Sequence, residues 1–578
     1  MFFELPNLHA FAKKAAATSM LALFATTGST AFAQKVKNVI LLIPDGCSLA
    51  TVSTARWYQW YNNPDKEFLY IDPYLSGTVR TTCSNAPIGD SAPTTSCYMT
   101  GYNQLAGWVS TYPVADEKND IYPMDPAKAY QPLTTLFEAA RIMYGKSTGL
   151  VCTCEFPHAT PADCTSHSYD RGKYDWIIPQ QVHNGINVLI GGGAGLLPKE
   201  SEEFLKNKGY GVFRNDIQGM RSYQGDNMWA LYGYSDMSYD IDRDPAKQPA
   251  IDEMTKIAIE KLSHNPNGFF LMVEGSKVDW AAHDNDPIAM ATDFLAFDRA
   301  CHEAFEFAKR DGNTAVIVVP DHGNSGLSIG RRDQGDYAHR SKDQLFGALN
   351  KMKLSAPAMA DKINKTPFED VQKVFKEYFG FELSDRELEA LKQNREYKMS
   401  PVPKEERKPF KGSLYNSSLS RMIAQFMTER TGLAFTTNGH TGEDVFLASY
   451  HPDMNFRARG MITNIQLNEY MCKMIGTTHD ALDSLTTANF APHTEVLGKL
   501  KCEITMTKHE GKDAGTLNVA GKYKGKQFAM TIHAGSNIVE VKQGKATRNV
   551  ELPSVVVYVD KNKTFYLKRD ILDYVLVL

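Results

Sequence analysis

Residues 38–46 read NVILLIPDG, and this stretch decides the fold class of the chain. A short, continuous apolar run that is rich in Val and Ile is typical of a strand buried on both faces of a parallel sheet. Runs of the same kind recur, with helical patterns between them, at 147–152, 187–192, 268–275, 314–320 and 444–450. The sequence therefore predicts an α/β domain with a central, mostly parallel sheet flanked by helices.

Two regions outside these runs differ in pattern. Residues from about 351 to 430 are charged and helical, and the Pro- and Lys-rich break SPVPKEERKPFKG interrupts them. This pattern favours a helical insertion with a solvated, charged face. From 477 to 578 the sequence alternates polar and apolar residues between Gly and Asn turn signals, which predicts a small β-rich C-terminal appendage. The α/β domain is expected to span residues 34–476.

The first 33 residues have the pattern of a secretory signal peptide. Lys13 and Lys14 precede an apolar run, and Ala31-Phe32-Ala33 supplies small residues before the expected cleavage site. The apolar run is too short for a membrane anchor, and no later segment is apolar enough to span a bilayer. We therefore expect an exported protein, periplasmic or secreted.

The overall composition narrows the class of partner. A net charge of -4 without a basic stripe argues against nucleic-acid binding and favours a small-molecule partner. The 9 cysteines lack paired C-x-x-C spacing, which argues against a disulfide framework or a structural zinc cluster. Most of them are expected to be small buried residues. Cys152 and Cys154 have too few partners in the sequence to predict a metal site.

Carboxylate and imidazole side chains gather where the predicted strands end. An Asp after a strand is more often a helix cap than a ligand, so each position alone is a weak signal. Recurrence at several strand ends favours a functional site, because open α/β sheets bind ligands at the carboxyl ends of their strands. Mixed Asp and His ligands suit Zn²⁺, and oxygen ligands suit Mg²⁺. The candidates are Asp45, Glu274, Asp279, His283, Asp321, His322 and His440.

The chain resembles the alkaline phosphatase family in five blocks that occur in the family's order. These are ILLIPDG, DSAPTTSCYMTG, HATPADCTSHSYDR, FFLMVEGSKVDWAAH with VIVVPDH, and NGHTGED. The resemblance covers roughly residues 37–476 without the insertion. It implies hydrolysis of small-molecule phosphate monoesters with two Zn²⁺ and one Mg²⁺ as cofactors, and the family's usual assembly is a homodimer.

The resemblance also implies roles for individual residues. Ser91 is the expected nucleophile that becomes phosphorylated, Arg171 grips the phosphate, and Asp90 orients Arg171. The expected mechanism is a double displacement with retention at phosphorus. The implied ligand sets are Asp279, His283 and His440 for one zinc, Asp45, Ser91, Asp321 and His322 for the second, and Asp45, Thr160 and Glu274 for the magnesium.

Two positions depart from a well-studied bacterial branch of the family, which has Asp and Lys there. His158 is expected to lie as an ordered residue beyond the ligands of the magnesium, with direct metal binding as the alternative. Trp280 cannot donate an ammonium group to phosphate, so we expect weaker phosphate retention. His167 is as readily a packing residue as a site residue, and GGGAG at 191–195 is expected to be a strand-end turn.

Three other functions stay open at this point. A sulfatase of the same superfamily is disfavoured because the nucleophile block is DSAPT rather than C-x-P-x-R. A phosphodiesterase is disfavoured because Thr160 and Glu274 complete a third metal site and Arg171 would crowd a second ester group. A non-catalytic exported protein that binds phosphate or metal is disfavoured because Ser91 and every implied ligand are present.

Overall fold

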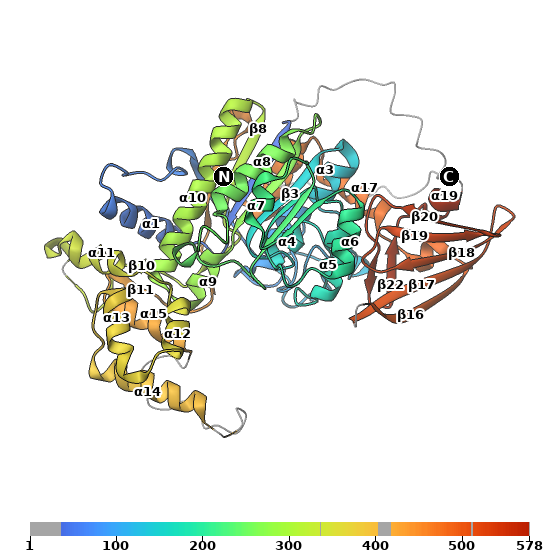
Figure 1. Ribbon diagram of the computed structural model, residues 1–578. Coiled ribbons are helices and arrows are strands. Elements are labelled where there is room, and N and C mark those ends of the chain that lie inside the picture. The colour runs from blue at the N-terminus through green and yellow to red at the C-terminus, as the bar shows by residue number, and fades with distance from the viewer. Residues whose placement is uncertain (1–35, 336, 401, 403–417, 510–511, 577–578) are drawn as a thin grey trace. The chain divides into compact units, whose positions relative to one another are not determined.

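The computed structural model describes residues 36–578 except 336, 401, 403–417, 510–511 and 577–578, so the expected signal peptide lies outside the described residues. A 10-stranded sheet forms the centre of the fold (Figure 1). In spatial order its strands are β14 (Gly460–Thr463), β2 (Leu75–Arg80), β13 (Val445–Tyr450), β8 (Thr314–Val318), β1 (Asn38–Pro44), β7 (Phe269–Gly275), β3 (Ser147–Glu155), β4 (Val188–Gly192), β6 (Met228–Tyr232) and β5 (Gly211–Arg214).

This sheet is mostly parallel, as the sequence predicts. The strands from β8 through β1, β7, β3, β4 and β6 to β5 pair in parallel. β13 runs antiparallel to both of its neighbours, β8 and β2. Each of the six apolar runs found in the sequence forms a strand of this sheet, and the run at 147–152 extends to Glu155. The prediction of the fold class is therefore confirmed.

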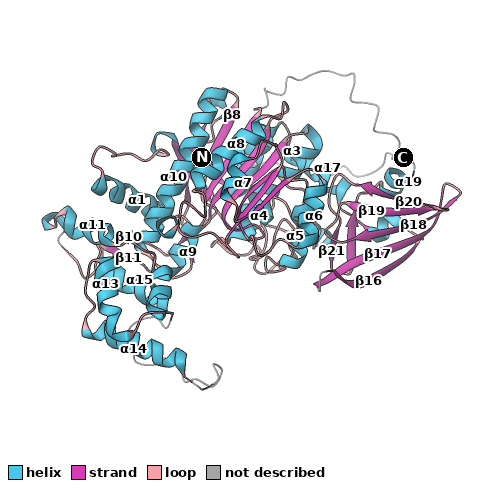
Figure 2. Ribbon diagram, viewed as in Figure 1, coloured by secondary structure: helices cyan, strands magenta, loops and turns pink. Residues whose placement is uncertain are grey.

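Helices cover both faces of the sheet (Figure 2). Successive side chains of β1 belong to opposite hydrophobic clusters, because side chains alternate along a strand. Val39 and Leu41 pack with α2 (Ser91–Thr100), α3 (Leu136–Tyr144) and α16 (Asn464–Ile475). Ile40 and Leu42 pack with α1 (Leu49–Asn62), α8 (Ile251–Ser263) and α10 (Pro287–Asp311). This two-sided burial explains why the run is continuously apolar.

The predicted helical region has a hydrophobic cluster of its own rather than only a solvated face. Phe375, Phe379 and Phe426 are fully buried in it, and it also includes Ala281 and Ala282 of the neighbouring helix α9 (Lys277–Asp284). The region is thus attached to the core domain by apolar packing. Its helices are α12 (Ala356–Asn364), α13 (Val371–Phe379), α14 (Asp385–Met399) and α15 (Leu419–Glu429), and α11 (Lys342–Lys351) directly precedes the predicted start of the region.

The C-terminal region is rich in strands, but it begins with a helix. α17 (His479–Asn489) precedes β15 (Ala491–Pro492), which joins β22 (Thr564–Leu567) and β21 (Val557–Val559) in a 3-stranded sheet. A separate antiparallel meander has 5 strands, drawn in orange-red in Figure 1. They are β16 (Lys501–His509), β17 (Lys512–Tyr523), β18 (Lys526–His533), β19 (Ile538–Gln543) and β20 (Ala546–Glu551).

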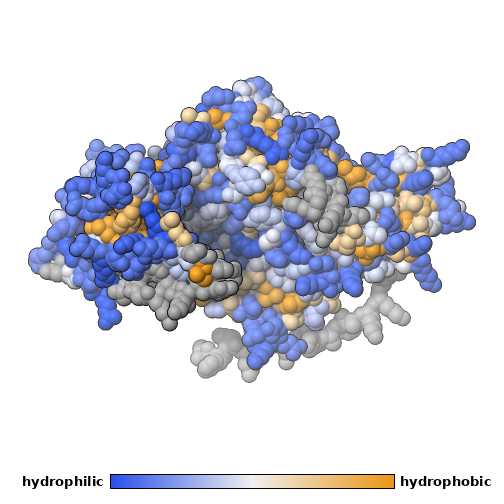
Figure 3. All heavy atoms as spheres, turned by 60° about the horizontal axis from the view of Figure 1, so that its bottom comes forward, coloured by the Kyte–Doolittle hydropathy of each residue, from blue (hydrophilic) through white to orange (hydrophobic). Residues whose placement is uncertain are grey.

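Hydrophilic residues cover most of the surface that faces the reader in Figure 3, with smaller hydrophobic areas between them. Among the described residues, no helix combines the length and the apolar character that a membrane span requires. The cysteines are free, and all are buried except Cys502, as expected for small apolar residues. β4 ends inside the GGGAG run, which confirms that this run is a strand-end turn.

Candidate metal centre and active site

Three of the predicted acids meet at one edge of the central sheet. β1 lies between β7 and β8 and is parallel to both, so the carboxyl ends of the three strands are adjacent. Asp45 directly follows β1, Glu274 lies at the end of β7, and Asp321 lies three residues after the last residue of β8. All three side chains are fully buried. The strand order therefore places the candidate site at the edge where open α/β sheets bind their ligands.

Asp45, Asp321 and His322 form the first cluster, in which one ligand-type atom of each residue lies within 4.8 Å of the others. The Ser91 hydroxyl belongs beside it. Ser91 Oγ lies 3.4 Å from Asp45 Oδ1 and 3.3 Å from His322 Nε2. Ser91 is the first residue of α2, so its hydroxyl lies at the positive end of the helix dipole. The structure thus brings this predicted set of four residues together.

Asp279, His283 and His440 form the second cluster, again within 4.8 Å. Asp279 and His283 are one turn apart on α9, a spacing that places both on the same side of the helix. His440 comes from β12 (His440–Thr441), and its Nε2 lies 3.2 Å from His283 Nε2. The His440 ring also stacks on the His322 ring with 3.8 Å between centroids, so the two clusters adjoin.

The three imidazoles of these clusters are oriented in the same way. Nδ1 of His283, His322 and His440 lies 2.7, 3.0 and 2.9 Å from the backbone carbonyls of Asn438, Gly323 and Gly89, respectively. A carbonyl oxygen can only accept, so each Nδ1 carries the proton when the ring is neutral. Nε2 of each neutral ring then carries the lone pair, and these atoms face the clusters. This is the orientation that metal-binding histidines need.

Asp45, His158 and Glu274 form a third cluster within 4.8 Å, and Asp45 therefore belongs to two clusters. Thr160 lies two residues after His158 on α4 (Ala159–Asp163) and is fully buried. Asp45 and Glu274, two of the predicted magnesium ligands, thus lie together in the structure, and His158 lies in the same cluster.

The clusters, and Thr160 beside His158, contain buried oxygen atoms that make no hydrogen bond within the described part of the chain. Burying a carboxylate without a partner is costly, and several carboxylates at one place also repel one another. Divalent cations would supply both the missing partner and the opposite charge, so the residues present fit metal ions. The atoms are Asp45 Oδ2, Thr160 Oγ1, Glu274 Oε1 and Asp321 Oδ2.

Gly46 allows the first two clusters to approach each other. Its φ is +58°, and a Cβ at this position would lie 2.2 Å from Asp279 Oδ1. Its backbone N–H donates to Asp321 Oδ1 over 3.0 Å. A side chain at residue 46 would therefore push Asp279 away from its cluster, which explains why glycine follows Asp45.

Arg171 is held from two sides next to Ser91. Its Nη1 donates to Asp90 Oδ1 over 2.6 Å, and Asp90 Oδ2 accepts the Gly107 N–H over 2.9 Å. Burial alone would raise the pKa of Asp90, but the charge of Arg171, the nearby histidines and the Gly107 N–H together outweigh it and lower the pKa. Arg171 Nη2 lies 2.9 Å from His158 Nε2. A direct ion pair between Asp90 and Arg171 therefore supports the predicted orientation of Arg171 by Asp90.

The contact with Arg171 fixes the tautomer of His158. A guanidinium only donates, so His158 Nε2 accepts and the proton of the neutral ring lies on Nδ1. Burial, followed by the charge of Arg171, lowers the pKa of His158 to about 3, so the ring is neutral. His158 Nδ1 makes no hydrogen bond to the described residues. With this tautomer, the neutral His158 ring presents a donor on Nδ1.

Metal-free Glu274→Gln protein is expected to be more stable than metal-free wild type at pH 8. Burial raises the pKa of Glu274 to about 7 in the folded chain, from 4.5. The protonated Glu274 side chain is tolerated in the fold, so its contribution to the free energy of unfolding is complete below pH 4.5. This contribution is lost as the pH rises through 7, because the buried carboxyl group then ionises. The stability gap should reach about 3 kcal/mol at pH 8 and vanish near pH 4. Urea unfolding with chelator at a series of pH values measures this stability difference. A difference that does not change with pH would contradict the raised pKa of Glu274.

Several residues near the site escaped the sequence analysis. Asn324 Nδ2 donates to Asp279 Oδ1 over 2.6 Å, and Cys154 Sγ donates to Glu274 Oε2 over 3.3 Å. The expectation that Cys152 and Cys154 lack partners is therefore corrected, because Glu274 is their neighbour. Asn324 lies two residues after the candidate ligand His322, and this position in the sequence could have marked it as a site residue. His167 is buried and contacts Glu138 rather than any of the three clusters.

Comparison with known proteins agrees with this fold. A family model described as alkaline phosphatase matches residues 36–477. Alkaline phosphatase 3 of Bacillus subtilis is 30% identical over 461 residues, which cover 76% of this chain and 89% of that protein. Alkaline phosphatase 4 of the same organism is 29% identical over 458 residues, which cover 77% of this chain and 89% of the relative.

A solved structure gives the same result in three dimensions. The cold-active alkaline phosphatase from the psychrophile Shewanella sp. superimposes with a TM-score of 0.64 at 25% identity, covering 76% of this chain and 100% of that one. The matched relatives and the shared fold identify the chain as a phosphatase-type hydrolase. The chain belongs to the alkaline phosphatase family.

Proposed function

We propose that this chain hydrolyses small-molecule phosphate monoesters through a phosphoserine at Ser91. One observation carries the proposal. The Ser91 hydroxyl lies at the N-terminus of α2, in contact with Asp45 and His322 of the first cluster. Membership of the alkaline phosphatase family supports the phosphomonoesterase class.

Two Zn²⁺ and one Mg²⁺ are the proposed cofactors. When bound, the zinc ions would lower the pKa of a coordinated hydroxyl and neutralise charge on the phosphoryl group. The mixed His and Asp sets suit zinc, and the oxygen atoms around Glu274 suit magnesium. The proposed sets are Asp279, His283 and His440 for the first zinc, Asp45, Ser91, Asp321 and His322 for the second, and Asp45, Thr160 and Glu274 for the magnesium.

The side chains of the protein account for binding and orientation in this proposal. The Arg171 guanidinium can grip two phosphoryl oxygens, and the ion pair with Asp90 keeps it in place. Ser91 Oγ attacks phosphorus, and the alcohol leaves with a proton. Water then attacks the phosphoserine and releases inorganic phosphate and free Ser91. Two displacements at phosphorus give net retention, as the family resemblance implies.

One assay decides between this function and its alternatives. Metal-replete protein is tested against a chromogenic phosphate monoester, a phosphodiester and a sulfate ester, each with and without chelator. We expect chelator-sensitive turnover of the monoester far above the other two. Preferred diester or sulfate ester turnover would identify another hydrolase of the superfamily. No chelator-sensitive turnover of any of the three would favour a non-catalytic protein that binds phosphate or metal.

Trp280→Lys is expected to tighten product inhibition by inorganic phosphate about 10-fold, because a lysine could add one charge-assisted hydrogen bond. The nearby Lys277 cannot supply it, since its Nζ lies over the Trp280 ring at 3.8 Å and pairs with Asp236. Trp280→Phe keeps an aromatic ring and serves as the control. An inhibition constant that is unchanged or weaker in Trp280→Lys contradicts the expectation, and steady-state inhibition kinetics measure it.

We further propose the organisation of the whole chain. Residues 34–476 would form the catalytic domain with a helical insertion at about 351–430, and 477–578 a β-rich appendage. The end of the family match at residue 477 supports this boundary. We also propose an exported protein, periplasmic or secreted, that forms a homodimer and does not bind nucleic acid specifically. The pattern of the first 33 residues supports export, the net charge argues against nucleic-acid binding, and the family resemblance is what supports the homodimer.

A further inference from the structure

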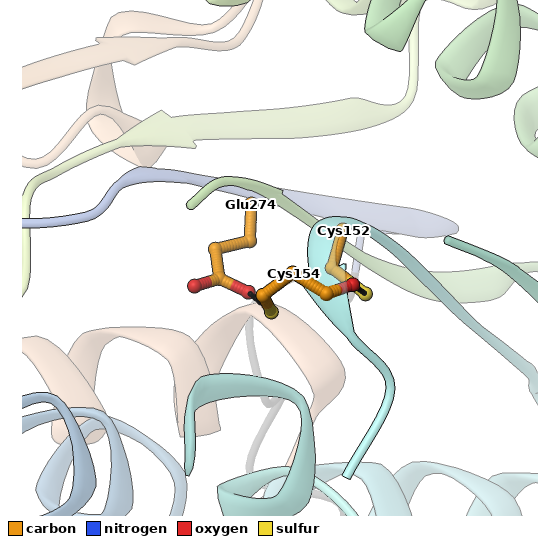
Figure 4. A group of neighbouring side chains, drawn as sticks. All are labelled: Cys152, Cys154 and Glu274. Atoms are coloured by element: carbon orange, nitrogen blue, oxygen red, sulfur yellow. Dashed lines mark hydrogen bonds between the residues drawn. The ribbon is translucent and has the colours of Figure 1, made fainter. Parts of the chain in front are cut away.

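Two buried thiols lie behind the third cluster. Figure 4 shows the Glu274 carboxylate turned toward the thiol of Cys154, with Cys152 on the far side of it. Cys154 Sγ donates to Glu274 Oε2 over 3.3 Å, and Cys152 Sγ donates to the Cys154 carbonyl over 3.5 Å. All three side chains are fully buried. The thiols are therefore too enclosed to meet substrate, and Cys154 contacts the site through Glu274.

The two oxygens of Glu274 have different surroundings. Oε2 accepts the Cys154 thiol, whereas Oε1 is buried and has no partner within the described residues. Glu274 also clusters with Asp45 and His158 in the proposed magnesium site. A donor on Oε2 fixes the rotation of the carboxylate, so Oε1 is left free for the cation.

The backbone around Cys154 is fixed as well. Cys152 lies opposite Glu274 in the parallel pairing of β3 with β7, and the β3 register with β4 shifts between Val151 and Glu155. The Ser276 hydroxyl accepts the Cys154 N–H over 3.0 Å. A Cβ at Gly191 would lie 2.6 Å from Cys152 Sγ. Gly191, the first glycine of the GGGAG turn, thus leaves space for the Cys152 thiol. This packing role differs from the phosphate contact that a glycine makes in a phosphate-binding loop.

We propose that Cys154 is a positioning residue that orients Glu274 and thereby sets the affinity of the third site for Mg²⁺. This inference rests on the proposed function in one respect, which is that the third site binds magnesium. Cys152 holds the Cys154 carbonyl, and Gly191 leaves the space that Cys152 occupies. Outer residues that orient a metal ligand typically contribute 10- to 100-fold to metal affinity.

The test compares Cys154→Val, which fills the space without a donor, with Cys154→Ser, which keeps one. Each purified zinc-loaded, magnesium-free protein is titrated with Mg²⁺ in a calorimeter. We expect Cys154→Val to weaken Mg²⁺ binding about 10-fold or more, and Cys154→Ser to stay within about 3-fold of wild type. Cys154→Ala, which also lacks the donor, replaces the valine variant if that variant does not fold.

Cys301→Val is the matched control, because Cys301 is an equally buried thiol in the cluster on the other side of the sheet. Wild-type Mg²⁺ affinity in Cys154→Val would overturn the inference, as would equal weakening in Cys301→Val or a wild-type protein that binds no Mg²⁺. The proposed function fails separately, if metal-replete wild type does not turn over a phosphate monoester. The binding titration does not depend on turnover, so the two failures are distinguishable.

Discussion

Ser91→Ala is expected to lower kcat for a phosphate monoester on the order of 10⁴- to 10⁶-fold, because removal of a nucleophile eliminates the covalent route. Ser91 Oγ is the hydroxyl that contacts both Asp45 and His322. Alanine fits the first turn of α2, so the fold and the Asp and His clusters should persist. Single-turnover kinetics and metal analysis of the same preparation measure the two effects separately.

Thr95→Ala is the matched control for this experiment. Thr95 is a buried hydroxyl residue of the same helix, and its Oγ1 makes no hydrogen bond to the described residues. We expect its kcat to stay within about 10-fold of wild type, because any effect would act only through packing. Substantial turnover by Ser91→Ala with full metal content would reject Ser91 as the nucleophile. Trapping of labelled phosphate on wild type but not on the variant would support it.

Asp45→Asn should separate stability from activity. Asp45 belongs to both the first and third clusters, so the substitution weakens two proposed metal sites at once. Activity should fall at least about 10³-fold, since several kcal/mol of charge stabilisation would be lost. Burial, and then the nearby Asp321, raises the pKa of Asp45, so an ionised Asp45 destabilises the metal-free fold. The metal-free variant should therefore resist urea better than metal-free wild type.

Asp163→Asn is the control for the Asp45 experiment. Asp163 is also fully buried near the site, but its Oδ1 accepts the Ser96 hydroxyl over 2.9 Å and it belongs to none of the three clusters. We expect Asp163→Asn to retain its metals and most of its activity. If Asp45→Asn binds three metals like wild type, the proposed membership of Asp45 in two metal sites is wrong. Metal analysis after gel filtration, together with urea unfolding, gives both readouts.

Much of the fold could be predicted from the sequence because burial on two faces leaves a local signal. The β1 run is continuously apolar because Val39 and Ile40 point into different clusters, and the same reason applies to the other five runs. The insertion and the start of the C-terminal region were less predictable. The many charged residues of the insertion hid the apolar pattern of the buried cluster around Phe375. The C-terminal region was predicted to be β-rich, but it begins with the helix α17.

The candidate site residues were also predictable in kind, although not in their contacts. Asp45 and Asp321 follow apolar strands, and parallel pairing alone brings such positions together. The contact of His158 with Arg171 gave no sequence signal, because 13 residues and a helix separate them. Cys154 was missed for the same reason, since it lies 120 residues from Glu274 in the chain.

The sequence by itself determined the α/β class, the family resemblance and the residue types at the strand ends, because these depend on local patterns of burial and on short motifs. Only the tertiary structure decided which of those residues share a cluster, which nitrogen of His158 carries the proton, and which oxygen of Glu274 is free. Such properties depend on atoms that are distant in the chain and within about 3 Å in space, where hydrogen bonds and charges act. Gly46 shows the difference, since only the packed structure explains why a Cβ there would displace Asp279.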